Sequence, residues 1–344
     1  MLKLLTASLI LLPTLALADG AREQLDWPTG KVFIPKKDFA NHSKANEELD
    51  ETVLAANPRL YLYPDFDPQA QDKILVIGLP GWGGRSENFI WTLINGLKKP
   101  GLTRRVVLAA IQDLENSGPR YQGQGDRAHA NRWDLGGDTV KAMRRFISRL
   151  AKQVGHLTVY FFGYSTGSFS GPMLAAAVAR WNPKETYRMA GAVAVGTGSP
   201  ISPARLNDKK QRVLFLVVPA YRGLEQDGKP KRSDQNNRLR AERYHKKLTE
   251  GGGESYLRFI ESARRHIDWH WGLLSQCRYF PNKKALDPGR GYHPHYWLSN
   301  PETYDYVVPF IQGKPVPEKA SDHPPQKCPF PDAPKIYDPA KDKK

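Results

Sequence analysis

Five residues near the middle of the chain have the types and the order that nucleophilic catalysis uses. Gly163-Tyr164-Ser165-Thr166-Gly167 follows the apolar run LTVYFF and precedes the small-residue run GPMLAAAVAR. The G-x-S-x-G pattern is typical of a sharp turn between a strand and a helix, on which a serine hydroxyl stands above the end of a sheet. Glycines suit such a turn because it is strained and neighbouring backbone packs close to it. We therefore predict that Ser165 is a nucleophile.

A serine hydroxyl needs a base, and the base needs an acid to orient it. When the nucleophile stands on a turn of this kind, the acid and then the histidine come later in the chain. His266 follows the last predicted strand and is the predicted base. His270 is the main competitor, but it falls at the start of an apparent helix. His293 and His295 are further alternatives.

The acid is expected in the loop that follows the apolar run RVLFLVV. Glu225, Asp227 and Asp234 are the carboxylates available there. Asp234 directly precedes a predicted helix, which places it at the end of the loop near the sheet, and we favour it as the acid. An N-cap of that helix is the alternative role for Asp234.

Hydrolysis through a serine also needs donors for the oxyanion of the tetrahedral intermediate, and two backbone N–H groups usually supply them. The residue after the nucleophile, Thr166, provides one. The second is expected in the glycine-rich loop Pro80-Gly81-Trp82-Gly83-Gly84, which follows an earlier strand. We predict Trp82 as this second donor.

Short apolar runs alternate with longer helical ones from residue 70 onward, and this alternation predicts the fold class. Strands without polar–apolar alternation, separated by helices, indicate a parallel sheet covered on both faces. We therefore predict an α/β fold with a mostly parallel sheet, to which residues 59–63 add an antiparallel edge. The predicted strands are 74–78, 105–111, 157–162, 190–195, 212–218 and 255–260, and the predicted helices are 87–98, 137–154, 171–180 and 239–248.

With these motifs the chain resembles the α/β-hydrolases over roughly residues 59–275, through the strand order, the loop 81–84, the serine turn and the order Ser165, Asp234, His266. The resemblance implies a serine hydrolase that uses no cofactor and most often cleaves carboxylic esters through an acyl-enzyme. Two alternatives remain. One is an acyltransferase or amidase with the same triad, and the other is a non-catalytic binding protein of the cell envelope. The intact nucleophile, acid and base favour an enzyme.

Many lipases and epoxide hydrolases of this fold carry a helical cap after the strand that corresponds to 190–195. Only 16 residues separate Val195 from Arg212 here. We therefore expect little or no cap domain, an open site and an extended or bulky substrate.

The N-terminal residues 1–18, MLKLLTASLILLPTLALA, have the pattern of a secretory signal peptide. Lys3 precedes a short apolar stretch, and the small residues Ala16 and Ala18 stand before the expected cleavage point. The stretch is interrupted by Pro13 and is too short for a membrane anchor, so we expect no transmembrane segment. The protein is predicted to be periplasmic or secreted, and the remaining chain divides into an N-terminal extension (19–58), a hydrolase domain (59–275) and a C-terminal extension (276–344).

Export changes the expected state of the two cysteines, Cys277 and Cys328. In an oxidising compartment a pair of cysteines favours a disulfide. This one would close a loop of about 50 residues and stabilise the protein by up to about 4 kcal/mol. Cys328 lies in a Pro- and Lys-rich tail, 313–344, which the disulfide would attach to the body of the protein.

The composition excludes some classes of protein and favours certain partners. The 344 residues are 40% hydrophobic and 25% charged, which excludes a disordered or fibrous chain. The formal net charge of +16 favours an ester substrate that is anionic, polymeric or associated with lipid. Nine basic and four acidic residues lie within 222–247, on the expected rim of the site.

Two other kinds of site are not expected. His266 and His270 are spaced like metal ligands on a helix, but Ile267 follows His266 where a metalloprotease has its catalytic glutamate. We therefore predict no metal. No motif indicates nucleotide binding or recognition of a specific nucleic acid.

Overall fold

The computed structural model describes residues 27, 29–35, 53–54, 56–81, 86–112, 137–180, 186–196, 211–217, 232–260, 301–323 and 336–337. The predicted signal peptide, Cys277 and Cys328 lie outside these residues.

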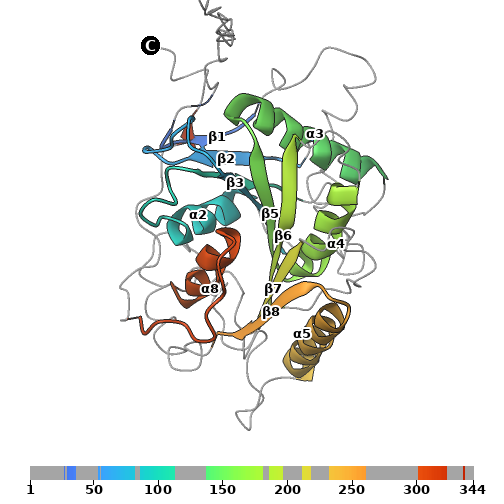
Figure 1. The fold of residues 1–344 in the computed structure, drawn as a ribbon. Helices are drawn as coiled ribbons and strands as arrows, with labels where there is room; N and C mark the ends of the chain where they lie inside the picture. Colours follow the sequence, from blue (N-terminus) through green and yellow to red (C-terminus); the bar gives the residue numbers. More distant parts are fainter. Residues whose placement is uncertain are drawn as a thin grey trace, which may run out of the picture.

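A single twisted sheet forms the centre of the described structure (Figure 1). Its strand order is β8-β7-β6-β5-β3-β4-β2-β1-β9. The strands are β1 (Val32–Phe33), β2 (Arg59–Leu62), β3 (Lys73–Leu79), β4 (Val106–Ala110), β5 (Leu157–Tyr164), β6 (Tyr187–Val195), β7 (Arg212–Val217), β8 (Glu254–Phe259) and β9 (Ile336–Tyr337).

The strand directions confirm the predicted mostly parallel sheet. Neighbouring strands from β4 through β3, β5, β6 and β7 to β8 are all parallel. β2 is antiparallel to both β4 and β1, so the antiparallel edge predicted for residues 59–63 is present. Parallel strands need long crossovers, and the helices of this fold supply them.

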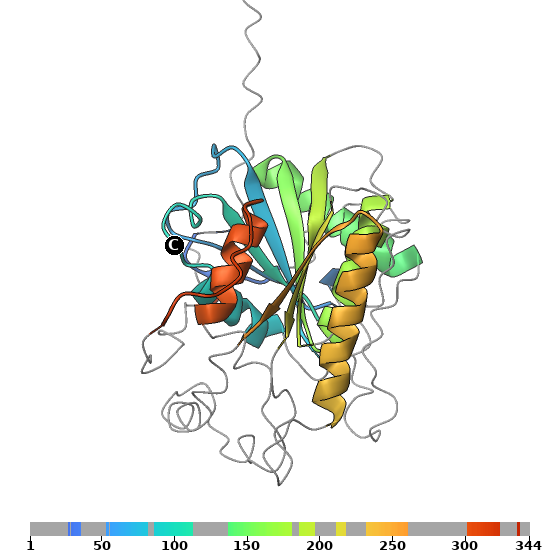
Figure 2. The same cartoon turned by 60° about the horizontal axis from the view of Figure 1, so that its bottom comes forward.

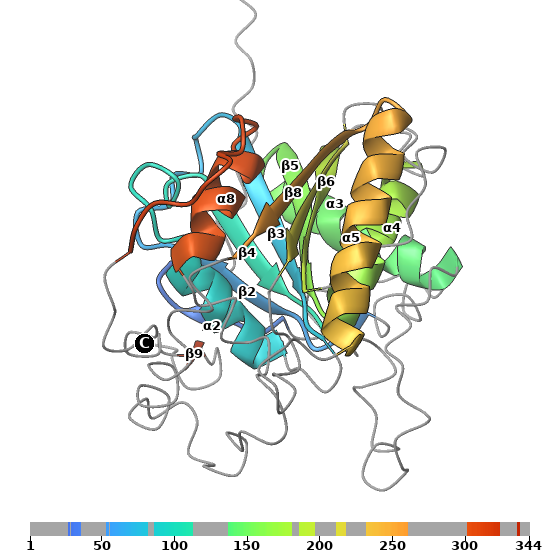
Figure 3. The same ribbon diagram turned by 90° about the horizontal axis from the view of Figure 1, so that it is seen from below.

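The helices cover both faces of the sheet. α2 (Ser86–Gly96) and α8 (Pro301–Ile311) pack on one face, and α3 (Gly137–Val154), α4 (Thr166–Arg180) and α5 (Arg232–Glu250) pack on the other. Figures 2 and 3 show α8 and α5 on opposite sides of the strands. None of the helices in the described ranges is long and apolar enough to cross a bilayer.

Alternate residues of each central strand enter the two halves of the core. In β3, Ile74 and Val76 pack with α2 and α8, whereas Leu75, Ile77 and Leu79 pack with α3 and α4. Because both faces are covered, every position of β3 is buried. This explains why the central strands read as continuous apolar runs in the sequence.

Part of the segment interpreted as a C-terminal extension belongs to this core. α8 buries Tyr304, Val307 and Phe310 against the sheet and α2. The Tyr304 hydroxyl donates a hydrogen bond to the carbonyl oxygen of Thr92 in α2 over 3.0 Å. The α/β domain therefore includes a helix well beyond residue 275.

The chain after α8 is also held to the domain. Arg258 of β8 donates hydrogen bonds to the carbonyl oxygens of Val316 and Pro317. The carboxylate of Asp305 accepts a hydrogen bond from the backbone N–H of Ser321 at 2.8 Å, and its Oδ2 lies 2.6 Å from Nε2 of His323. Hydrogen bonds thus attach residues 316–323 of the tail to the domain.

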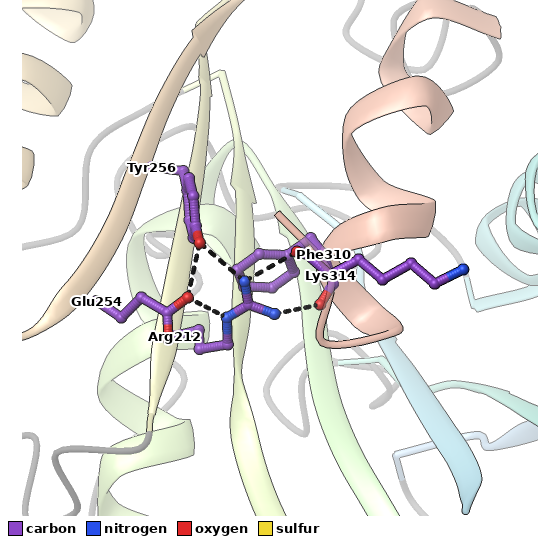
Figure 4. Close-up of polar contacts among 5 residues, drawn as sticks. All are labelled: Arg212, Glu254, Tyr256, Phe310 and Lys314. Carbon is purple, nitrogen blue, oxygen red and sulfur yellow. Dashed lines mark hydrogen bonds and ion pairs between the residues drawn. The ribbon is translucent and has the colours of Figure 1, made fainter. Parts of the chain in front are cut away.

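Arg212, at the start of β7, joins β8 to the end of α8 (Figure 4). Its side chain is 9% exposed. Nε donates to the Glu254 carboxylate at 2.7 Å, and Nη2 donates to the Tyr256 hydroxyl at 2.9 Å. Nη1 and Nη2 also donate to the carbonyl oxygens of Phe310 at 2.9 Å and Lys314 at 3.1 Å. The guanidinium thus gives a second donor to the carbonyl oxygen of Phe310, which also accepts from the N–H of Gly313 at 3.1 Å, and ties the segment after α8 to β7 through Lys314.

We predict that Arg212→Ala lowers the free energy of unfolding by about 2–4 kcal/mol, because it removes a buried side chain that donates four hydrogen bonds to β8 and to the end of α8 and the segment after it. Arg104→Ala is the matched control, since Arg104 makes an exposed ion pair with Asp67 at 3.0 Å. The control is expected to cost less than about 1 kcal/mol. Urea unfolding measures both, and equal losses would contradict the role assigned to Arg212.

Candidate active site

The turn predicted at residues 163–167 is present. β5 ends at Tyr164, α4 begins at Thr166, and Ser165 alone connects them. The φ angle of Ser165 is +54°, in the left-handed region. This conformation is uncommon for a residue other than glycine and costs about 1–3 kcal/mol. The surrounding structure must therefore hold Ser165 in place. The helix also begins five residues earlier than the sequence pattern predicted.

Hydrogen bonds fix the backbone of Ser165 on both sides. Its N–H donates to the carbonyl oxygen of Val195, at the end of β6, over 3.0 Å. Its carbonyl oxygen accepts from the N–H of Phe169 at 3.1 Å and from the hydroxyl of Ser168 at 2.6 Å. Ser168 is not among the site residues predicted from the sequence. Ser168 is the third residue of α4, and its hydroxyl bonds to the carbonyl group of the residue that precedes the helix. Serine hydroxyls often make such local bonds to the backbone, so this pattern could have been recognised in the sequence.

Two glycines allow the turn to pack. A side chain at Gly163 would collide with the backbone of Gly167, and a side chain at Gly167 would collide with the carbonyl group of Leu79. The end of β3, the end of β5 and the first turn of α4 therefore meet backbone to backbone. The two glycines of the G-x-S-x-G pattern are required for this close approach.

The loop that follows β3 begins directly beside the serine. A Cβ placed on Gly81 would lie 2.7 Å from Cβ of Ser165 and 2.9 Å from the ring of Tyr164. The backbone at Gly81 is thus in contact with the serine turn, as a donor loop for an oxyanion must be. Trp82, the predicted donor, lies outside the described residues.

The N-terminus of α4 provides a positive electrostatic potential next to Ser165. The helix is 15 residues long and begins one residue after Ser165. The N-terminus of a helix carries a partial positive charge, and its first N–H groups have no partner within the helix. This arrangement stabilises an anion that forms at the serine.

A column of aromatic rings supports the turn from below. Tyr164 stacks on Phe89 of α2, with ring centroids 5.4 Å apart, and Phe89 meets Phe162 edge-on at 5.9 Å. Phe162 in turn stacks on Tyr304 of α8 at 6.3 Å. All four rings are buried. The position of Ser165 therefore depends on helices that lie far from it in the sequence.

The other predicted site residues follow strands that end at the same edge of the sheet. Tyr164 is aligned with Val195, and Val217 is aligned with Phe259. Asp234 is the third residue of α5, which begins after β7, but its side chain is outside the described part of the chain. His266, His270, His293, His295, Glu225 and Asp227 also lie outside it.

The structure thus brings together Ser165, Thr166 and Gly81. Within the residues that the structure describes, no group of three or more His, Cys, Asp or Glu side chains is arranged to hold a metal ion.

We predict that Gly167→Ala destabilises the protein by about 1–3 kcal/mol, because the new methyl group meets a backbone carbonyl that cannot move aside cheaply. Gly171→Ala, one turn further along α4, is the matched control. A Cβ there would make only ordinary contacts at 3.6 and 3.9 Å. The control is expected to be neutral or stabilising by up to about 1 kcal/mol through helix propensity. Thermal unfolding of the two variants tests this, and a tolerated Gly167→Ala would contradict the close packing described above.

Comparisons with known proteins give distant structural similarities. No protein-family model matches the sequence, and no curated protein matches it. A thermostable esterase is similar in structure with a TM-score of 0.42 at 16% identity, over 74% of this chain and 58% of the esterase. This chain therefore spans less than two thirds of that esterase.

Two smaller proteins are similar to this chain over almost their whole length. Esterase PE8 has a TM-score of 0.38 at 16% identity, over 61% of this chain and 95% of the esterase. Acyl-protein thioesterase 2 of Zea mays has a TM-score of 0.33 at 11% identity, over 62% of this chain and 97% of the thioesterase.

The architecture itself identifies the fold. Among the described strands, which follow the order β1-β2-β4-β3-β5-β6-β7-β8, only β2 runs antiparallel to the others. Ser165, whose φ angle is in the left-handed region, connects the central strand β5 to the helix that follows it. β9 adds one strand beyond β1. The order of the strands and the turn at Ser165 together show that the chain has the α/β-hydrolase fold.

Proposed function

We propose that the protein is an exported serine hydrolase that cleaves carboxylic esters, with Ser165 as nucleophile, His266 as base and Asp234 as acid. The observation that carries the proposal is the strained backbone of Ser165 at the carboxyl edge of the sheet, next to the N-terminus of α4 and the backbone of Gly81. Strain of this kind is concentrated at functional positions, where packing maintains an otherwise unfavourable geometry.

The chain length after β8 is compatible with His266 as the base. β8 is separated from β5 by β7 and β6, which amounts to about 14 Å across the sheet. His266 comes six residues after Ile260, and six extended residues span about 20 Å. A loop that leaves β8 at the edge bearing Ser165 is therefore long enough to bring the imidazole to the serine.

The acid is proposed at the start of α5. β7 is two strands from β5, and Asp234 lies in the first turn of the helix that follows β7. A carboxylate there would be near the same edge of the sheet as Ser165. Glu225 and Asp227, in the segment between β7 and α5, are the alternatives.

The proposed reaction follows from these roles. Oγ of Ser165 attacks the ester carbonyl carbon while His266 takes its proton, and the backbone N–H groups of Thr166 and Trp82 stabilise the oxyanion. The intermediate collapses to an acyl-serine, and the alcohol leaves with the proton from His266. A water molecule, deprotonated by His266, then attacks the acyl carbon; the bond to Oγ of Ser165 breaks as His266 returns the proton to Oγ, and the carboxylic acid leaves.

We predict that a fluorophosphonate probe labels the wild-type protein and that Ser165→Ala abolishes the labelling. The probe reacts with an activated serine hydroxyl, and the alanine variant lacks that oxygen. Ser170→Ala, in the same helix, is the control and should retain labelling. Fluorescence of the labelled protein on a gel measures the result, with circular dichroism to show that each variant is folded. Folded wild-type protein that takes up no label would contradict the proposal and favour a non-catalytic binding protein.

We predict that Asp234→Asn lowers ester turnover by about 10⁴-fold, because a neutral amide no longer holds the histidine in the reactive tautomer. Glu225→Gln and Asp227→Asn are the controls and should retain turnover within a fewfold of wild type. The rate of p-nitrophenyl ester hydrolysis measures all three. Normal turnover in Asp234→Asn, with a large loss in one of the controls, would transfer the role of the acid to that residue.

A further inference from the structure

The two helical layers differ strongly in charge. α3, α4 and α5 together carry twelve basic and four acidic side chains, whereas α2 and α8 carry three acidic and no basic ones. Figures 2 and 3 show α5 and α8 on opposite faces of the sheet, so the helical layer of α3, α4 and α5 is the basic one. An anionic surface would attract and orient such a molecule.

The outward face of α5 combines this charge with an exposed apolar residue. Arg232, Leu239, Arg243 and Lys246 follow one another at spacings of seven, four and three residues, which places them on one side of a helix. All four are exposed. On the opposite side of the helix, Ala241 and Leu248 are buried in a cluster with β7 and β8.

Leu239 is unusual on this surface. Its exposed fraction is 60%, and among the described residues the other exposed large hydrophobic side chain is Phe169 at 39%. Leu239 stands between Arg238 and Arg240 in the sequence and one turn before Arg243. An isolated exposed leucine needs no explanation. Leu239 therefore offers one apolar contact surrounded by cationic side chains, a combination that suits the headgroup region of an anionic membrane.

The contacts that Lys246 and Arg243 make within α5 are weak, so these side chains can contact other anions instead. Nζ of Lys246 lies 3.7 Å from the Glu250 carboxylate, and both side chains are well exposed. Arg243 contacts the neighbouring Tyr244, through a hydrogen bond of 3.3 Å to its hydroxyl. Exposed pairs of this kind contribute little, so lipid phosphates can replace them at small cost.

We infer that the outward face of α5 docks on an anionic lipid surface. The helix lies flat on the surface, Leu239 enters the boundary between headgroups and acyl chains, and Arg232, Arg243 and Lys246 contact phosphates. A soluble polyanion would be recognised by the charges alone, and the exposed leucine among them favours lipid as the partner. Docking does not require the proposed hydrolase activity.

Co-sedimentation with lipid vesicles tests this inference. The wild-type protein should bind vesicles of equal parts phosphatidylglycerol and phosphatidylcholine, and should not bind phosphatidylcholine alone. The triple variant Arg232→Gln, Arg243→Gln, Lys246→Gln should bind about a hundredfold more weakly, at about fivefold per charge. All variants carry the same N-terminus as the wild-type protein.

The matched control removes three lysines near the other helical layer, Lys98→Gln, Lys314→Gln and Lys319→Gln. These three are exposed and follow α2 or α8. The control has the same net charge as the triple variant but should bind the mixed vesicles nearly as well as the wild type. Equal losses in the two triple variants would overturn the inference, since binding would then depend on net charge and not on α5.

Leu239→Gln distinguishes lipid from a soluble polyanion. It should weaken binding to the mixed vesicles several-fold and leave retention on a heparin column unchanged. Unchanged vesicle binding in Leu239→Gln, with heparin retention lost in the α5 triple variant, would overturn the assignment to lipid and favour a polyanion. Ser165→Ala should bind vesicles like the wild type, so the outcome is separate from that of the labelling experiment.

Discussion

The close contact of three backbone segments is the constraint on which the centre of the molecule depends. The end of β3, the end of β5 and the first turn of α4 approach so closely that Gly163 and Gly167 have no room for a side chain. This contact holds Ser165 at a φ angle of +54°. The energy stored in that conformation is offset by the hydrogen bonds of its backbone to Val195 and Phe169 and by the buried sheet beneath it.

The support for this contact comes from the other face of the sheet. The ring of Tyr164 rests on Phe89 of α2, and the ring of Phe162 rests on Tyr304 of α8. α8 is in turn held at its end by Arg212 of β7. A change at Arg212, at the opposite edge of the sheet, can therefore reach Ser165 through the packing of α8.

The strained turn and the basic side chains lie in different parts of the fold. The strained serine lies at the carboxyl edge of the sheet, whereas the basic side chains gather on the helical layer of α3, α4 and α5. Electrostatic attraction acts over about 10 Å at moderate ionic strength, far beyond the range of the contacts that position a nucleophile. The two features can therefore change independently during evolution.

Most of the central strands and helices, and the serine turn, could be predicted from the sequence. Continuous apolar runs such as that of β7 predict strands buried on both faces, and G-x-S-x-G after an apolar run predicts the turn, because these signals are local. The start of α4 was predicted too late, since Thr166, Gly167 and Ser168 are poor helix formers and the turn, not their propensity, starts the helix there.

How distant segments combine depends on the tertiary structure. The place of α8 in the core rests on contacts between residues far apart in the chain, such as Arg212 with Phe310, 98 positions apart, and Thr92 with Tyr304, 212 positions apart. The sequence of α8 has a helical pattern in Tyr304, Val307 and Phe310, but the pattern does not say which surface it covers. A local pattern specifies an element and its apolar side, whereas its partner is selected by packing of the whole chain, which no short stretch of sequence contains.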